Sequence, residues 1–207
     1  ARVAGETLLA DLIAAAVTLH PEAYADIAGE PFASASADLR LRLLAAVTGC
    51  VGGRDWPPRE ERVARLEARI RAGGFRQGTL GGCLVRTVRH GLLVCREPTE
   101  MPLRAIAPGA AIDWDGRFRI HLSAGAPDGL SVGPVGHGAV ARLRRRAAAP
   151  LPASVFAALP ALYDRGGLVT VPHLGPGGHV AERDDAPGVA AVFRPRRPLL
   201  GPAFALV

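Results

Sequence analysis

The chain has 207 residues, of which 49% are hydrophobic and 21% charged, a composition that fits one ordinary domain or two small ones and excludes a disordered chain. Its 25 basic side chains, all arginine, outnumber 19 acidic ones and give a net charge of +6. This charge favours a polyanionic partner such as nucleic acid. No apolar run approaches the roughly 18 residues of a membrane-spanning helix, so we expect a cytoplasmic protein without membrane contact.

The first third of the chain predicts helices. Apolar residues from Leu8 to Val17 recur at helical spacing until Pro21 stops the run. Ser36 then has the pattern of an N-cap for a second helix, whose leucines share one face. We expect Arg40 and Arg42 of this helix to point away from that apolar face.

The stretch CVGGRDWPP, residues 50–58, contains the Gly-Gly-x-Asp core of the phosphate loop SGGxDS of ATP pyrophosphatases. That loop needs a preceding apolar strand and two serines. Here a predicted helix precedes the motif, and Val51 and Trp56 replace the serines. We therefore predict a turn between two helices, in which Trp56-Pro57-Pro58 opens the next helix, because proline suits a first turn.

Farther along, the pattern changes to strands and tight turns. The predicted hairpins join residues 84–89 to 92–95 through His90-Gly91, and residues 112–114 to 117–122 through Asp115-Gly116. Alternation in the second hairpin puts Phe118 on one face and Arg117 and Arg119 on the other. A two-residue turn would pair Trp114 with Arg117, so we expect the indole on the basic face.

The remaining pattern completes an α+β fold. Short helices are predicted near residues 137–148 and 153–159, and strands at residues 168–171, 189–193 and 204–207. The simplest division is an N-terminal helical module, residues 1–73, followed by a β-rich module, residues 74–207. We expect the second module to be a small barrel or sheet with short helices.

Three arginine clusters are candidates for nucleic-acid binding. They comprise Arg142, Arg144, Arg145 and Arg146 in RLRRR, Arg194, Arg196 and Arg197 in RPRRP, and Arg117 and Arg119 beside Trp114. Guanidinium groups along one edge can contact consecutive phosphates. The alternative is that each cluster is a solvated surface without a ligand. Because all three fall within the β-rich module, we favour nucleic acid.

Residue types that could perform catalysis or bind metal are present but match no strong signature. His173 and His179 lie near Glu182, Asp184 and Asp185 in a glycine-rich stretch, where solvated loop residues are the favoured interpretation. Cys50, Cys83 and Cys95 are far apart and form no CxxC, so we expect buried free thiols. The motifs GxSxG, GxGxxG and HExxH are absent. We therefore assign no catalytic or metal-binding residue.

The order of several stretches resembles the C-terminal half of tRNA(Ile)-lysidine synthetase in its alphaproteobacterial form. The stretches are VGGRDWPPR, TLGGCLVRTVRHGLLVCREP, WDGRF, LPASVFAALPALYDRGGLVTVPHLG and FRPRRPL. They run from about residue 51 to residue 199, and the preceding helices fit the same region, so the resemblance covers essentially the whole chain.

The resemblance implies a non-catalytic part of a bacterial ligase. In that family an N-terminal PP-loop domain uses ATP and magnesium to adenylate the wobble cytidine of an isoleucine tRNA, and lysine then displaces AMP. This chain lacks the SGGxDS loop and resembles the domains that dock the body and acceptor stem of the tRNA, without a cofactor of their own. By this resemblance Arg144 and Arg145 contact the backbone, whereas Phe156 stands where the family commonly has arginine.

Two other interpretations stay open at this point. The chain can be an interaction module that packs on the catalytic PP-loop domain or forms a homodimer, with its arginines merely solvated. A hydrolase that uses His173 or His179 is the least favoured, since it would have to act without any added domain.

Overall fold

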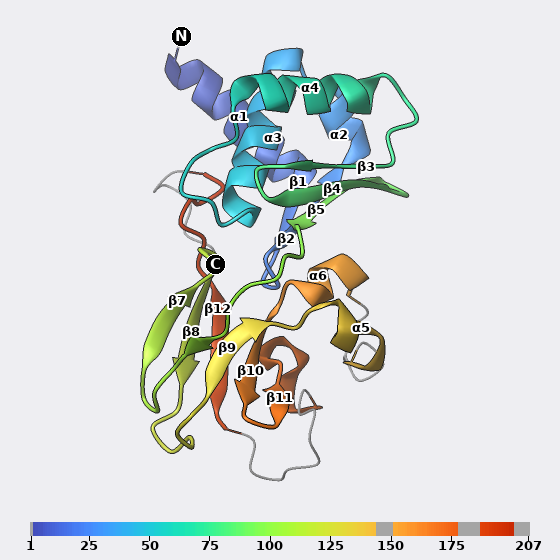
Figure 1. The fold of residues 1–207 in the computed structure, drawn as a ribbon. Helices are drawn as coiled ribbons and strands as arrows, with labels where there is room; N and C mark the ends of the chain where they lie inside the picture. The colour runs from blue at the N-terminus through green and yellow to red at the C-terminus, as the bar shows by residue number, and fades with distance from the viewer. Residues whose placement is uncertain (1, 144–150, 178–186, 201–207) are drawn as a thin grey trace. The chain divides into compact units, whose positions relative to one another are not determined.

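The computed structural model describes residues 2–143, 151–177 and 187–200, and it contains two compact units (Figure 1). Unit 1 comprises the chain up to Glu97 together with the segment from Pro195 onward, and unit 2 comprises Pro98–Arg194. This division differs from the boundary expected at residue 73, because strands that follow that residue pair with strands near the N-terminus. The α+β class is confirmed.

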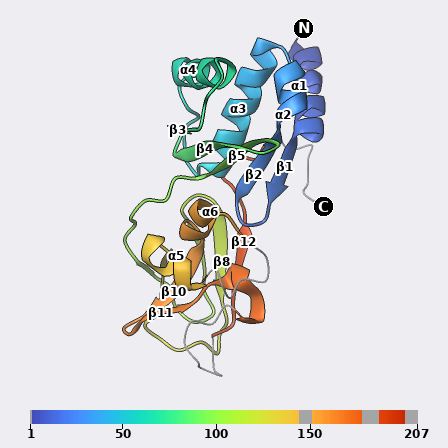
Figure 2. The same cartoon turned by 90° about the vertical axis from the view of Figure 1, so that its right-hand side faces the viewer.

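Unit 1 is an antiparallel sheet with helices on one face (Figure 2). Its elements are α1 (Arg2–Ala16), β1 (Val17–His20), β2 (Tyr24–Ala28), α2 (Gly29–Ser34), α3 (Ala37–Val51), α4 (Glu60–Arg71), β3 (Gln77–Leu80), β4 (Cys83–Val88) and β5 (Gly91–Arg96). The strand order is β1-β2-β5-β4-β3. The first predicted hairpin is thus confirmed as β4–β5, but its turn is Arg89-His90 rather than His90-Gly91, because Gly91 pairs with Val88. The β1–β2 hairpin was not predicted.

The core of unit 1 forms between the sheet and the helices. Alternation along β2 buries Ala25 and Ile27, and their partners across β5 are Val94 and Leu92. These side chains join one apolar cluster with Leu43 and others of α3. Burial of this cluster is what holds helices and sheet together, since apolar area removed from water is the main stabilising term.

Helix α3 begins where the sequence indicates, because the hydroxyl of Ser36 accepts a hydrogen bond from the Leu39 amide at 3.4 Å. The expectation that Arg40 points away from the core is wrong. Arg40 is 4% exposed, and its Nε lies 2.6 Å from Oε1 of Glu67 in α4. Its guanidinium also donates to the carbonyl of Ala35, so the charge is satisfied inside the α3–α4 contact.

Helix α4 begins at Glu60 rather than at Trp56. Helical backbone angles are disfavoured for a residue that precedes proline, and here two prolines follow one another. Trp56 and Pro57 therefore stay outside the helix, and Arg59 takes the N-cap position. The turn interpretation of this stretch is otherwise confirmed, with Gly53 at a φ of 64° after the end of α3.

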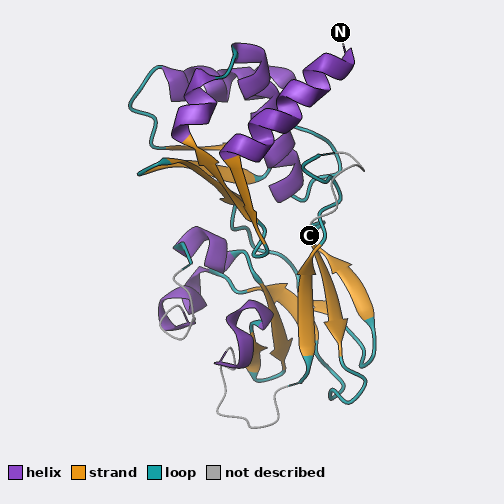
Figure 3. Ribbon diagram, turned by 180° about the vertical axis from the view of Figure 1, so that it is seen from behind, coloured by secondary structure: helices purple, strands orange, loops and turns teal. Residues whose placement is uncertain are grey.

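Unit 2 contains two antiparallel sheets and short helices (Figure 3). Its elements are β6 (Arg104–Ala105), β7 (Ala111–Trp114), β8 (Phe118–Leu122), β9 (Ser131–Pro134), α5 (His137–Leu143), α6 (Ala153–Ala157), β10 (Pro160–Asp164), β11 (Gly167–Thr170), the 3-10 helix η2 (Pro172–Gly177) and β12 (Val189–Phe193). The strand orders are β11-β10-β9-β6 and β12-β8-β7. The strand predicted at residues 204–207 and the end of the helix predicted at 137–148 lie outside the described residues. No helix among the described residues is long and apolar enough to cross a membrane.

Candidate nucleic-acid interface

The hairpin β7–β8 carries two of the predicted contact residues. Asp115 and Gly116 both have positive φ, 52° and 64°, as the Asp-Gly turn requires. The strands, however, pair Trp114 with Phe118, and Arg117 lies in the turn. Trp114 is 3% exposed and packs near Phe118, with 6.3 Å between ring centroids. The expectation of an indole on the basic face is therefore wrong, because the extra turn residue shifts the pairing.

Arg117 is a buried structural residue. It is 2% exposed, and its Nη2 lies 2.7 Å from Oδ2 of Asp115, itself 4% exposed. The same nitrogen donates to the carbonyl of Ala158 at 2.7 Å, and the guanidinium carbon lies 5.0 Å from the centroid of Phe118. The expectation of an exposed Arg117 is wrong, because these groups satisfy its charge inside unit 2.

Arg119 is accessible but shares its charge with an aspartate. It pairs directly across the hairpin with Asp113, and Nη1 lies 3.1 Å from Oδ1. The two side chains are 32% and 61% exposed, and a solvated pair of this kind contributes only about 0–1 kcal/mol. A phosphate could therefore compete for this guanidinium, with Asp113 opposing it.

The RPRRP cluster is divided between the two units. Arg194 follows β12 in unit 2, where its amide donates to the carbonyl of Arg117 at 2.7 Å and its side chain is exposed. Arg196 and Arg197 belong to unit 1 and are also exposed. The guanidinium of Arg196 pairs with Asp55 in the loop between α3 and α4. The expectation that all three arginine clusters lie in one β-rich module is therefore not met.

The RLRRR cluster is only partly described. Arg142 lies in α5, but the placement of its side chain is outside the described part. Arg144, Arg145 and Arg146 also lie outside the described residues. Their contact with nucleic acid therefore stays a prediction.

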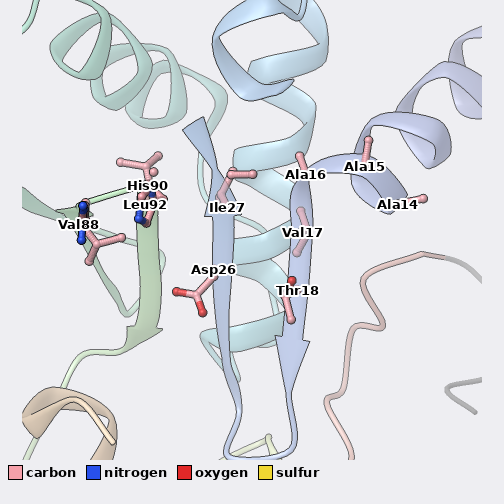
Figure 4. A pocket seen from close by; sticks show the side chains of 13 residues that line it. Ala14, Ala15, Ala16, Val17, Thr18, Asp26, Ile27, Val88, His90 and Leu92 are labelled. Carbon is pink, nitrogen blue, oxygen red and sulfur yellow. The ribbon is translucent and has the colours of Figure 1, made fainter. Parts of the chain in front are cut away.

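One pocket of unit 1, of about 470 Å³, is lined by the end of α1, the start of β1, the end of β2 and the β4–β5 turn (Figure 4). Thr18 of β1 and Asp26 of β2 are partners in the strand register there, and His90 lies at the β4–β5 turn. Oδ2 of Asp26 already lies 3.0 Å from Nε2 of His20. The other lining side chains are mostly alanine and valine, so this pocket carries no assembled nucleophile and base among its lining residues.

Of the residues considered as metal ligands and not assigned, only His173 lies in the described part of the chain. No group of three or more His, Cys, Asp or Glu side chains gathers in the described part of the chain. His173 lies in η2 and is half-buried, with its ring edge-on to Phe118 at 5.2 Å. It is therefore not the solvated loop residue that the sequence suggests. His179, Glu182, Asp184 and Asp185 lie outside the described residues.

The cysteines are buried free thiols, as predicted. Burial raises the pKa of Cys50 from its ordinary 9.0 to about 12, because a thiolate would lose its hydration there. The neutral thiol thus contributes stability fully below pH 9, and this contribution is lost as the pH rises toward about 12.

We expect the native chain to resist thiol-specific modification at mildly alkaline pH, because Cys50, Cys83 and Cys95 are each at most 1% exposed. After unfolding in guanidinium chloride, all three thiols should react with Ellman's reagent within minutes. Rapid modification of Cys50 in the folded chain would contradict its burial.

Sequence reasoning missed one group of arginines, which lies in unit 1. Arg54, Arg59 and Arg62 line a pocket of about 490 Å³ together with Trp56, whose side chain is 82% exposed. The available signal was an arginine on each side of a Trp-Pro-Pro sequence, which prolines keep extended at the surface.

The fold and these surfaces define a basic, two-unit α+β protein. The proteins to which the chain is similar are tRNA(Ile)-lysidine synthases. That of Caulobacter vibrioides is 37% identical over 82 residues, which make up 37% of this chain and 20% of the relative. That of Rhizobium meliloti is 29% identical over 119 residues, 58% of this chain and 26% of the relative. That of Ruegeria pomeroyi is 35% identical over 95 residues, 45% of this chain and 22% of the relative.

These comparisons confirm the resemblance to alphaproteobacterial tRNA(Ile)-lysidine synthetase that the sequence motifs indicate. The matched stretches span about a fifth to a quarter of the length of these relatives. No family model matches the chain, and no solved structure matches it.

Proposed function

We propose that the chain is the C-terminal, tRNA-recognising part of a tRNA(Ile)-lysidine synthetase, the ligase that attaches lysine to the wobble cytidine of isoleucine tRNA. The observation that carries this proposal is the similarity to three synthases of that name. According to this proposal, the chain binds the body and acceptor stem of the tRNA in the cytoplasm and is itself non-catalytic. ATP and magnesium belong to a PP-loop domain of the same polypeptide.

Charge and side-chain type support the docking role. A-form RNA hides its base edges in a deep, narrow groove, so proteins recognise its shape through phosphate and ribose contacts. Arginine suits this task, because its planar guanidinium donates two parallel hydrogen bonds to a phosphate. Arg194 and Arg197 are exposed, and neither has an acidic partner among the residues that the structure describes.

The affinity of the chain for isoleucine tRNA is expected to fall steeply as salt rises, because each phosphate contact releases counterions. Each contact removed should reduce the slope of log affinity against log salt by about 0.9. The variant Arg144→Ala/Arg145→Ala should therefore lose about 1.8 in slope. Filter binding of labelled tRNA over a salt series measures this.

The matched control for that experiment is Arg65→Ala/Arg71→Ala. This change removes the same charge from exposed positions of α4, so the slope should stay close to that of the unmodified chain. An unchanged slope in Arg144→Ala/Arg145→Ala would remove that pair from the interface. Absence of any tRNA binding at low salt would contradict the proposed function as a whole.

One observation favours a second candidate function, an interaction module that packs on the catalytic domain or on another copy. Arg117, Arg119 and Arg196, which were expected to contact nucleic acid, are each paired with an aspartate. Light scattering after size exclusion, together with a tRNA gel shift, separates the two functions. A stable dimer that gives no shift at low salt would favour the interaction module.

A further inference from the structure

The loop between α3 and α4 forms one wall of the pocket that holds the exposed tryptophan. The opposite wall is the β3–β4 turn, Gly81-Gly82, and all of these residues belong to unit 1. We name this space, lined by Arg54, Trp56, Arg59, Arg62 and that turn, the Trp56 pocket. The loop that carries Trp56 is the segment from the end of α3 to the start of α4 in Figure 1.

The exposure of Trp56 needs an explanation. An indole that is 82% exposed gives up most of the stabilisation that burial of so large an apolar side chain provides. Pro57 and Pro58 fix their own backbone angles and keep the segment before α4 extended, so the ring is presented from a stiff support. A flat aromatic face held in this way is suited to stacking against a ligand.

The charges around the indole are predominantly positive. Arg54, Arg59 and Arg62 are exposed, and no ion pair or hydrogen bond joins their guanidiniums to any described residue. The one acid among the lining residues is Asp55, whose carboxylate is already paired with Arg196. The pocket thus retains uncompensated cationic groups, whereas the arginines of the β7–β8 hairpin are paired with aspartates.

Glycine in the β3–β4 turn leaves space for the guanidiniums of Arg54 and Arg96. Gly82 has a φ of 79°, and a Cβ there would lie 2.8 Å from Nε of Arg54 and 2.5 Å from Nη1 of Arg96. Nη1 of Arg96 also donates to the carbonyl of Gly82 at 3.1 Å. An added Cβ would therefore collide with both guanidiniums, of which Arg54 belongs to the pocket.

We propose that the Trp56 pocket binds one unpaired nucleotide of an RNA strand, with the base stacked on Trp56 and the adjoining phosphodiester held by Arg54, Arg59 and Arg62. This inference rests on the proposed function and names a place where the RNA is bound. An unpaired nucleotide is required, because a base within a duplex has both faces covered by its neighbours and cannot stack on a side chain.

The N-terminus of α4 contributes little to this site. Arg59 caps the helix without a side-chain hydrogen bond, but Glu60 and Glu61 in the first turn already complement the helix dipole. The binding energy therefore comes from the guanidiniums and the indole. The pocket is also distinct from a PP-loop, since it holds no serine hydroxyl among its lining residues and stacks a base outside the helix N-terminus.

The chain offers a direct probe, since it contains two tryptophans and only Trp56 is exposed. In Trp114→Phe, the emission of Trp56 should be quenched when single-stranded tetrauridylate is added to the 207-residue chain. As a single substitution, without Trp114→Phe, Trp56→Ala should weaken the binding of labelled tetrauridylate by roughly 5- to 150-fold. A blunt-ended RNA duplex without a loop, added at the same total phosphate concentration, should quench Trp56 far less.

Charge removal on one helix provides the matched pair of variants. Arg59→Ala/Arg62→Ala should reduce the salt slope for tetrauridylate by up to about 0.7, since the pocket holds one phosphodiester and each single-strand phosphate contact contributes about 0.7. Arg65→Ala/Arg71→Ala removes the same charge from exposed positions of α4 outside the pocket, and it should leave the slope unchanged. Thermal unfolding of all variants checks that each remains folded.

The results of these experiments can contradict the proposed role of the Trp56 pocket without contradicting the proposed function of the chain. Binding of tRNA without quenching of Trp56 by either RNA would overturn the pocket and leave the proposed function standing. Equal slope losses in the two arginine double variants would also overturn it, because the effect would then be one of net charge. Equal competition by AMP at the same concentration would overturn the RNA-strand assignment in favour of a free mononucleotide.

Discussion

Replacing Asp115 by alanine is expected to lower the free energy of unfolding of unit 2 by about 3–5 kcal/mol, the usual cost of removing one partner of a buried ion pair. Asp115 is 4% exposed and Arg117 is 2% exposed, so the change leaves a guanidinium buried without its counter-charge. Alanine also adapts poorly to the φ of 52° at this position. Urea denaturation in a Trp56→Phe background, followed by the emission of Trp114, measures the effect.

The matched control is Asp113→Ala in the same hairpin. Asp113 is 61% exposed and pairs with the solvated Arg119, so its loss should cost no more than about 1 kcal/mol. Similar losses of stability in Asp113→Ala and Asp115→Ala would mean that Arg117 is reached by water. Arg117 would then return to the group of candidate phosphate contacts.

Gly91→Ala is the second substitution with a large expected effect, a loss of about 3–5 kcal/mol in the stability of unit 1, from backbone strain together with overpacking. Gly91 begins β5 at a φ of 152°. A Cβ there would overlap the carbonyl oxygen of Ile27 and lie 2.7 Å from the amide nitrogen of Gly29. Both neighbours are backbone atoms of the β2–α2 junction, so no side chain can move aside.

Gly49→Ala is the control for that substitution. Gly49 lies inside α3, and an added Cβ would meet only the flexible side chain of Arg197, at 3.7 Å. Alanine is favoured over glycine in a helix by about 1 kcal/mol, so this variant should be as stable as the parent or more so. Circular dichroism of both variants during thermal unfolding provides the comparison, and a stable Gly91→Ala would show that β5 can shift its register.

Local patterns predicted the elements whose determinants lie close together in the chain. Alternation around Phe118 identified β8, and Ser36 identified the start of α3. The β1–β2 hairpin was missed, because Val17 continues the helical spacing of α1 and becomes a strand only by pairing with Ile27, which itself pairs with β5. The division after Glu97 differs from the expected boundary for the same reason.

For the candidate site, too, local sequence patterns predicted only part of what the structure contains. Charge clusters can be counted in a sequence, but whether an arginine is free depends on groups that are distant along the chain. Arg117 is satisfied partly by Ala158, and Arg196 by Asp55. The Trp56 pocket likewise needs the β3–β4 turn to approach the loop, which no spacing in that loop reveals.

The return of the chain from unit 2 to unit 1 has a consequence for synthesis on the ribosome. Leu199 and Leu200 pack against the core of unit 1, yet they are translated after every residue of unit 2. Unit 1 therefore emerges first but cannot reach its final packing until this segment has been synthesised after unit 2.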